Sequence, residues 1–172
     1  DFFNPTKLDF YSSDNQKICD LDLSRFSSEK SKYTTLKRST LIEFLKNKLF
    51  SNNLRFGKEV KKISKIKEKL LINFKDNTND LVDFVVVSDG VFSNTKSVIE
   101  NKIIQPIYNG SIAIRTILKS LPELNYDKNN ISLVMLKNAH IVIYPINKKG
   151  EFNVVCIIRQ KLSNSIDLKA LI

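Results

Sequence analysis

Glycine, cysteine and histidine are scarce in this sequence, and tryptophan is absent. The four glycines stand far apart, at Gly57, Gly90, Gly110 and Gly150. None of them begins a Gly-x-Gly-x-x-Gly dinucleotide fingerprint. The two cysteines, Cys19 and Cys156, match neither a metal-ligand spacing nor a disulfide framework. Both lie in apolar segments, so we expect buried thiols in a reducing compartment and no metal site.

Long hydrophobic runs are also missing. No apolar stretch reaches the ~18 residues that a membrane-spanning helix needs. Residues 1–5 carry neither the basic region nor the apolar region of a secretory signal. We therefore expect a cytoplasmic protein without a membrane partner, and the 172 residues suffice for one domain or two small ones.

The formal net charge of +10 comes from 23 lysines but only 5 arginines, and asparagine is abundant at 18. Lysine and asparagine codons are both rich in A and T, so a genome rich in these bases raises both together. Sequence-specific nucleic-acid binding favours arginine with interleaved aromatics. We therefore expect no nucleic-acid partner, although a functional basic surface stays open as an alternative.

The apolar pattern moves from β to α/β and back to β. Expected strands are 5–12, 17–23, 54–57, 59–66, 69–74, 81–87, 108–118, 130–136, 139–146 and 151–160. Apolar residues at helical spacing predict a helix up to about Leu49. It begins either at a capping box of Thr40 and Glu43 or a few residues earlier, and a short helix follows Ser93. The fold class predicted is an α/β layer joined to an antiparallel sheet.

Two strand assignments carry most of this prediction. The run 81–87 is almost continuously apolar, so we expect it inside the α/β layer, buried on both faces beside the helix of 39–50. Residues 1–28 are expected to pair back onto the sheet of 105–161.

Four sequence motifs stand at the ends of these elements. Residues 37–41 read Lys-Arg-Ser-Thr-Leu, and 85–96 read Val-Val-Val-Ser-Asp-Gly-Val-Phe-Ser-Asn-Thr-Lys. Residues 108–115 read Tyr-Asn-Gly-Ser-Ile-Ala-Ile-Arg, and 138–145 read Asn-Ala-His-Ile-Val-Ile-Tyr-Pro. The last motif holds the only histidine of the chain.

In this order the motifs resemble those of the class A flavin-dependent monooxygenases, the aromatic hydroxylases that include salicylate hydroxylase and 3-hydroxybenzoate 6-hydroxylase. The family patterns are Arg-x-x-Leu, Asp-Gly-x-x-Ser-x-x-Arg, Gly-x-x-Ala-x-Arg and His-x-x-x-Tyr-Pro. The resemblance runs from about residue 33 to 160. Two positions depart from it: Ser88 replaces a small Ala or Gly, and Lys96 replaces the final arginine and loses its planar fork.

The resemblance implies FAD as cofactor, NADH or NADPH and O2 as co-substrates, and a small phenolic or aromatic-acid substrate. It implies cofactor contacts for Arg38, Val60, Asp89 and Gly90. A homodimer is compatible with it. The family's N-terminal glycine fingerprint and C-terminal Gly-Asp motif are absent, so we expect an internal fragment that by itself binds FAD weakly or not at all.

The same resemblance implies catalytic roles for His140 and Tyr144 and a substrate-binding role for Arg115. A neutral imidazole beside a phenol can accept its proton near pH 7. Strand alternation places His140, Val142 and Tyr144 on one face, which we expect to line a cleft. Arg115 either braces the sheet or steers a substrate carboxylate.

The implied domain boundaries follow from the same comparison. Residues 29–104 are expected to form part of an FAD-binding domain, 1–28 with 105–161 a substrate-domain sheet, and 162–172 the start of a return helix. Two other functions stay open, namely a hydroxylase of a hydrophobic quinone precursor and a non-catalytic basic module that binds anions or nucleic acid.

Overall fold

The computed structural model describes residues 1–28, 31–49, 54–121 and 125–161. The chain divides into two compact units by its internal contacts. Unit 1 comprises residues 1–48 and 109–172, and unit 2 comprises residues 49–108. Unit 2 is therefore inserted between two parts of unit 1. Whether these units are a substrate domain and a flavin domain stays a prediction.

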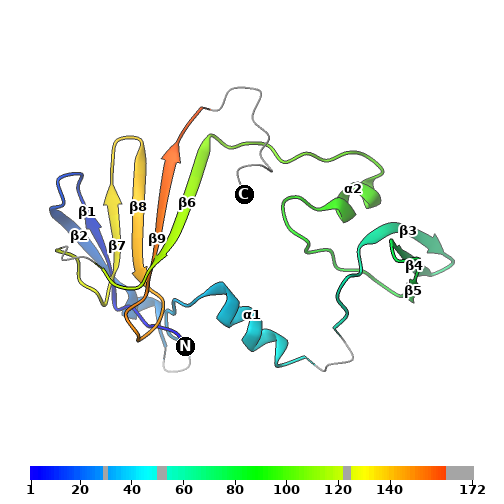
Figure 1. Ribbon diagram of the computed structural model, residues 1–172, viewed down its shortest axis with the longest axis horizontal. Coiled ribbons are helices and arrows are strands. Elements are labelled where there is room, and N and C mark those ends of the chain that lie inside the picture. Colours follow the sequence, from blue (N-terminus) through cyan, green and yellow to red (C-terminus); the bar gives the residue numbers. More distant parts are fainter. Residues whose placement is uncertain (29–30, 50–53, 122–124, 162–172) are drawn as a thin grey trace. The chain divides into compact units, whose positions relative to one another are not determined.

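Unit 1 is built on a six-stranded sheet in the order β2-β1-β7-β8-β9-β6 (Figure 1). Its strands are β1 (Lys7–Tyr11), β2 (Lys17–Asp22), β6 (Ser111–Leu118), β7 (Ile131–Met135), β8 (Ala139–Pro145) and β9 (Phe152–Arg159). The N-terminal hairpin pairs with the later strands, as predicted. The junction of β1 with β7 is parallel, however, while the other neighbours run antiparallel. Parallel neighbours need a long connection, and here everything from β2 to β6 supplies it.

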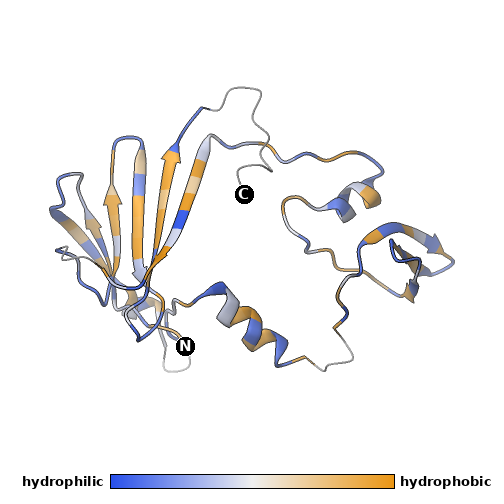
Figure 2. Ribbon diagram, in the orientation of Figure 1, coloured by the Kyte–Doolittle hydropathy of each residue, from blue (hydrophilic) through white to orange (hydrophobic). Residues whose placement is uncertain are grey.

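The core of unit 1 lies on one face of this sheet. Ile143 on β8 and Phe152 on β9 pack with Leu121, which follows β6 in the chain. Tyr11 on β1 meets Tyr126 edge to face, with ring centroids 4.8 Å apart. Figure 2 shows β7, β8 and β9 as largely hydrophobic strands. The segment after β6 therefore covers the face that carries the odd-numbered residues of β8.

Helix α1 (Arg38–Lys46) follows the N-terminal strands and a short 3-10 helix, Leu23–Phe26. It begins three residues earlier than the predicted capping box requires. Lys37 is the N-cap residue and makes no side-chain cap, so Thr40 lies inside the first turn and the predicted capping box is wrong. Leu41, Phe44 and Leu45 are all exposed on this helix.

The described residues of unit 2 contain a three-stranded antiparallel sheet in the order β3-β4-β5 and one helix. Its elements are β3 (Val60–Ile66), β4 (Lys69–Phe74), β5 (Asn79–Val82) and α2 (Asn94–Glu100). The hairpin of β3 and β4 confirms the sequence prediction. The helix after Ser93 is also confirmed, because the Ser93 hydroxyl caps it by accepting from the Lys96 N–H at 2.9 Å.

Two predicted strands of unit 2 are wrong. Residues 54–57 form no strand, and the apolar run after Val82 leaves the sheet. Phe84 and Val86 are 77% and 80% exposed, so this run is not buried within an α/β layer. The register explains why: Val82 pairs with Leu70, and β4 begins at Lys69, so the backbone beyond Val82 has no strand beside it.

Cys19 was expected to be buried but is exposed, because β2 is an edge strand whose side chains are almost all accessible. Cys156 on β9 is half-buried, and both thiols are free. The helix predicted for 162–172 lies outside the described residues. No helix in the described part of the chain is long and apolar enough to cross a membrane.

Candidate active site

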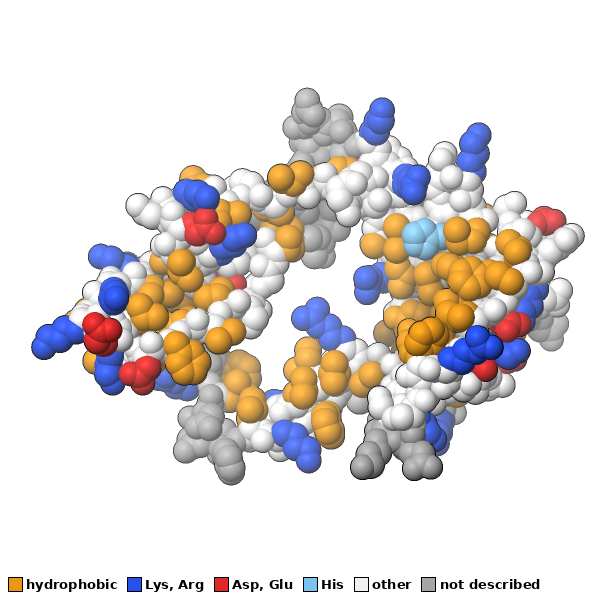
Figure 3. All heavy atoms as spheres, turned by 180° about the vertical axis from the view of Figure 1, so that it is seen from behind, with side chains coloured by type: hydrophobic (Ala, Val, Ile, Leu, Met, Phe, Trp, Pro, Cys, Tyr) orange, Lys and Arg blue, Asp and Glu red, His pale blue; other side chains and the backbone are white. Residues whose placement is uncertain are grey.

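His140 lies on the face of the six-stranded sheet opposite the core. Its cross-strand neighbours are Met135 on β7 and Ile157 on β9. The imidazole is half-buried, and no residue in the described ranges makes a hydrogen bond to it. Figure 3 shows the histidine among hydrophobic side chains on this face. The ring nitrogens of His140 are therefore available to a ligand, although its role stays a prediction.

A small pocket opens on the same face beside Tyr144. It has a volume of about 340 Å³, and its walls are residues 33–36 with Ile131, Val142 and Tyr144. Val142 and Tyr144 are the residues that alternate with His140 on β8. Apolar walls with a few hydroxyl groups suit a small ring that carries a polar substituent.

The loop 33–36 that closes this pocket is held in place by a network of hydrogen bonds. Thr35 exchanges backbone hydrogen bonds of 2.9 Å with Phe3 in both directions, and its hydroxyl donates to the Pro145 carbonyl. The Asn4 side-chain amide donates to the Tyr33 carbonyl at 3.0 Å and to the Thr34 hydroxyl at 2.8 Å. The pocket wall is therefore preorganised.

Arg115 shares the histidine face at the far edge of the sheet. It pairs with Val155 on β9, which in turn pairs with Val142 on β8. Since neighbouring strands lie about 4.8 Å apart, the Arg115 backbone is about 10 Å across the face from Val142. The side chain is exposed and makes no ion pair with any described residue. It is therefore placed to reach over the face rather than to line the Tyr144 pocket.

Unit 2 has a larger pocket that brings Val60 and Asp89 together. Its volume is about 870 Å³, and it lies between the start of β3 and residues 85–95. The run 85–87 forms an apolar wall, and Asp89 and Thr95 add polar groups. Two cations line it as well, but Arg55 is paired with Asp80 and Lys58 with Asp76.

The turn at Asp89 and Gly90 is shaped by hydrogen bonds to the helix that follows. The Asp89 carboxylate accepts from the Thr95 N–H at 3.4 Å, and hydrogen bonding by Ser93 and Thr95 lowers the pKa of this carboxyl. Gly90 has φ +89°, a left-handed conformation that side chains other than glycine rarely adopt. The turn therefore presents an ionised carboxylate at the pocket rim.

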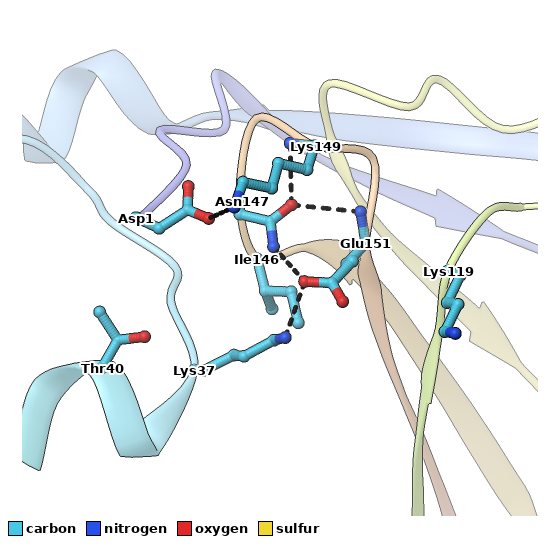
Figure 4. A pocket seen from close by; sticks show the side chains of 8 residues that line it. All are labelled: Asp1, Lys37, Thr40, Lys119, Ile146, Asn147, Lys149 and Glu151. Atoms are coloured by element: carbon cyan, nitrogen blue, oxygen red, sulfur yellow. Dashed lines mark hydrogen bonds and ion pairs between the residues drawn. The ribbon is translucent and has the colours of Figure 1, made fainter.

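Arg38 belongs to unit 1, as the first residue of α1, and its side chain is exposed. Its neighbours Lys37 and Thr40 line a pocket of about 450 Å³ at the β8–β9 turn (Figure 4). Lys37 reaches Glu151 at 2.7 Å, and this contact lowers the pKa of the Glu151 carboxyl. The cofactor contact implied for Arg38 stays a prediction.

The sequence did not reveal two groups of pocket residues. The loop 33–36 lies between the N-terminal strands and the first of the four motifs, so nothing marked it as a wall of the Tyr144 pocket. Arg55 and Lys58 belong to none of the four motifs, and only the fold shows that they line a pocket with residues 85–95. No group of three or more metal-ligating side chains occurs within the described ranges.

No family model matches the chain, and no curated protein matches its sequence. Solved structures do match its fold. HpxO from Klebsiella pneumoniae, crystallised with FAD and uric acid, superposes with a TM-score of 0.81 at 14% identity. The superposition covers 98% of this chain and 44% of HpxO. The chain shares the fold of a part of these FAD-dependent aromatic hydroxylases.

Two further structures agree with this result. A salicylate hydroxylase in complex with its substrate has a TM-score of 0.75 at 15% identity, covering 97% of this chain and 45% of the enzyme. A 2,6-dihydroxypyridine-3-hydroxylase from Arthrobacter nicotinovorans has a TM-score of 0.73 at 16% identity, covering 97% and 42%. The chain thus spans less than half the length of the enzymes it resembles, and the predicted fold class is confirmed.

Proposed function

We propose that this chain forms part of an FAD-dependent monooxygenase that hydroxylates a small aromatic ring, with NADH or NADPH and O2 as co-substrates. The observation that carries the proposal is the placement of His140 and Tyr144. Tyr144 lines a ring-sized pocket on the face of the sheet opposite the core, and His140 lies on the same face of β8, in a fold shared with aromatic hydroxylases.

The residues of the unit 2 pocket fit part of a flavin nucleotide. The apolar wall of 85–87 suits a flat ring, and the Asp89 carboxylate suits the hydroxyl groups of a ribityl or ribose chain. We assign Val60, Asp89 and Gly90 to this contact, and Arg38 to an anionic part of the cofactor. Bound FAD would supply the oxygen-transfer chemistry, while the protein orients the ring and excludes water.

The chain's own residues would then prepare the substrate. His140 accepts the proton of a phenolic hydroxyl, which makes the ring more electron-rich. Tyr144 hydrogen-bonds to a ring substituent, and Val142 and Ile131 keep water from the apolar side of the ring. Arg115 either braces β6 or binds a carboxylate that projects from the ring across the face.

The test uses the whole protein, supplied with FAD, NADH or NADPH, and a panel of phenols and aromatic acids. His140→Ala should slow hydroxylation by about 10²-fold, the usual scale for losing an acid–base group, while flavin reduction by the nicotinamide changes little. Met135→Ala is the matched control, because Met135 is the neighbour of His140 on the same face. Equal rates of hydroxylation in the wild type and His140→Ala would refute the assignment.

Two rival functions are tested by the same preparation. Activity restricted to a prenylated phenol would favour a quinone-precursor hydroxylase. Binding to nucleic acid without any flavin would favour a basic module. The positions of the lysines argue against such a module. Lys62 and Lys65 of β3, which pair with Asn73 and Leu70 of β4, are three positions apart in their strand. They therefore lie on opposite faces of the sheet. Figure 3 also shows basic side chains scattered over both units on the visible face.

A further inference from the structure

A third pocket of unit 1 has an unusual distribution of charge. It lies at the end of the six-stranded sheet and has a volume of about 320 Å³. Lys119, Lys128, Lys148 and Lys149 stand around it, while Phe3 and Phe152 are among its apolar residues. None of its lining residues, all from the described ranges, is acidic. We call it the lysine pocket.

Three carboxylates of the described residues lie near these lysines in the chain or in space, and only one of them pairs with a lysine of the pocket. Glu151 is paired with Lys37 and accepts from the Asn147 amide (Figure 4). Asp127 accepts from the Asn129 N–H at 2.9 Å and from the Asn130 amide at 3.3 Å. Asp1 lies 3.7 Å from the ammonium of Lys149. Lys119, Lys128 and Lys148 have no acidic partner in the part of the chain that the structure describes.

The turn that carries two of these lysines has a fixed shape. Asn147 is buried, and its side-chain oxygen accepts from the backbone N–H groups of Lys149 at 2.9 Å and Glu151 at 3.2 Å (Figure 4). Gly150 completes the turn with φ +83°. Lys148 and Lys149 therefore project from a rigid support, so fewer backbone motions must be frozen when a ligand binds.

The apolar side of the pocket is equally well held. Phe152 belongs to the core and is 4% exposed, so it closes the bottom of the pocket rather than offering surface. Phe3 is half-buried, and its backbone is fixed by the two hydrogen bonds to Thr35. The Phe3 ring is thus the aromatic surface that a ligand can contact.

We propose that the lysine pocket binds an organic phosphate with an aromatic ring, of the nucleoside phosphate class. Three ammonium groups that have no acidic partner among the described residues attract a multiply charged anion, and lysine binds phosphate as a compact point charge. The Phe3 ring offers a stacking surface for a base. This site is separate from the Tyr144 pocket and does not depend on the hydroxylase function.

The experiment measures binding of ADP, adenosine and inorganic phosphate to the full chain by isothermal titration calorimetry at two salt concentrations. ADP should bind more tightly than either of its parts, and less tightly at high salt. Lys128→Gln/Lys148→Gln should weaken ADP binding about 10-fold, because each exposed ion pair contributes only a few-fold. Phe3→Leu should weaken ADP binding and leave phosphate binding unchanged.

The matched control is Lys65→Gln/Lys137→Gln, which removes the same charge from β3 and from the turn between β7 and β8. It should leave ADP binding within two-fold of the wild type, by the same reasoning about local contacts. An equal loss in both double variants would show unspecific attraction and overturn the site. Phosphate that binds as tightly as ADP, or no ADP binding at all, would overturn it as well. Circular dichroism confirms that each variant is folded.

Discussion

Unit 1 and unit 2 differ in how far their apolar side chains are buried. Unit 1 buries Ile143 and Phe152 beneath the segment that follows β6. In unit 2, the segments that flank α2 leave Phe84, Ile103 and Ile107 between 77% and 94% exposed. Large exposed apolar surfaces are typical of sites that contact another protein segment or a ligand. The unit that carries the His140 face therefore has a core of its own, while the unit that carries the Asp89 turn has a much smaller one.

The largest contrast should come from truncating one aromatic side chain in each unit. Phe152→Ala removes a buried ring from unit 1 and should cost about 3–5 kcal/mol of unfolding free energy. Phe84→Ala removes an exposed ring from unit 2 and should change it by less than about 0.5 kcal/mol. Urea denaturation followed by circular dichroism measures both. Similar losses for the two variants would remove the contrast between the units.

Substitution of one carboxylate in each unit tests the same difference in burial with polar side chains. Asp9 of unit 1 is 1% exposed, accepts from the Asn130 amide at 2.8 Å and pairs with Lys17 at 2.7 Å. Asp9→Asn should cost about 1–3 kcal/mol, because it leaves buried groups imperfectly paired. Asp76→Asn in unit 2 breaks an ion pair with Lys58 that water reaches, so its effect should be smaller. The same urea titrations measure both losses of unfolding free energy. A larger loss for Asp76→Asn than for Asp9→Asn would contradict the prediction.

The smallest expected effect is a difference in pH response. The Asp9 and Asp20 carboxylates raise the pKa of Lys17 in the folded protein above its ordinary value of 10.5. The contribution of Lys17 to the unfolding free energy is therefore complete below pH 10.5 and is lost as the pH rises through the folded pKa. Lys58 and Thr78 lower the pKa of Asp76. The contribution of Asp76 to the unfolding free energy is complete above pH 3.8, its ordinary pKa, and is lost as the pH falls through the lower pKa of the folded protein.

Alkaline solution should therefore loosen the N-terminal hairpin of unit 1, and acid the β4–β5 loop of unit 2. Amide exchange followed by NMR across the pH range tests the two responses separately. Lys17→Met should abolish the alkaline response of unit 1 and leave the acid response of unit 2 intact. An unchanged alkaline response in that variant would mean that other groups control it.

The sequence predicts unit 1 better than unit 2 for a physical reason. In β7 to β9 the strand neighbours are adjacent in the chain and one face is buried, so alternation marks both the strands and the face of His140. The run 81–87 is apolar without alternation, and apolarity alone does not state which strand lies beside it. The loop 33–36 carries no pattern, because hydrogen bonds to Phe3, Asn4 and Pro145 determine its position.

The parallel contact of β1 with β7 has a consequence for biosynthesis. β1 ends at Tyr11 and β7 begins at Ile131, so the whole of unit 2 leaves the ribosome before the sheet of unit 1 can close. At a translation rate of about 5–20 residues per second, β7 is synthesised on the order of ten seconds after the N-terminal hairpin. During this interval the edge of β1 that β7 later occupies is open to other strands. Chaperone binding to the nascent chain should therefore concentrate on the N-terminal hairpin and decline once β7 has been synthesised.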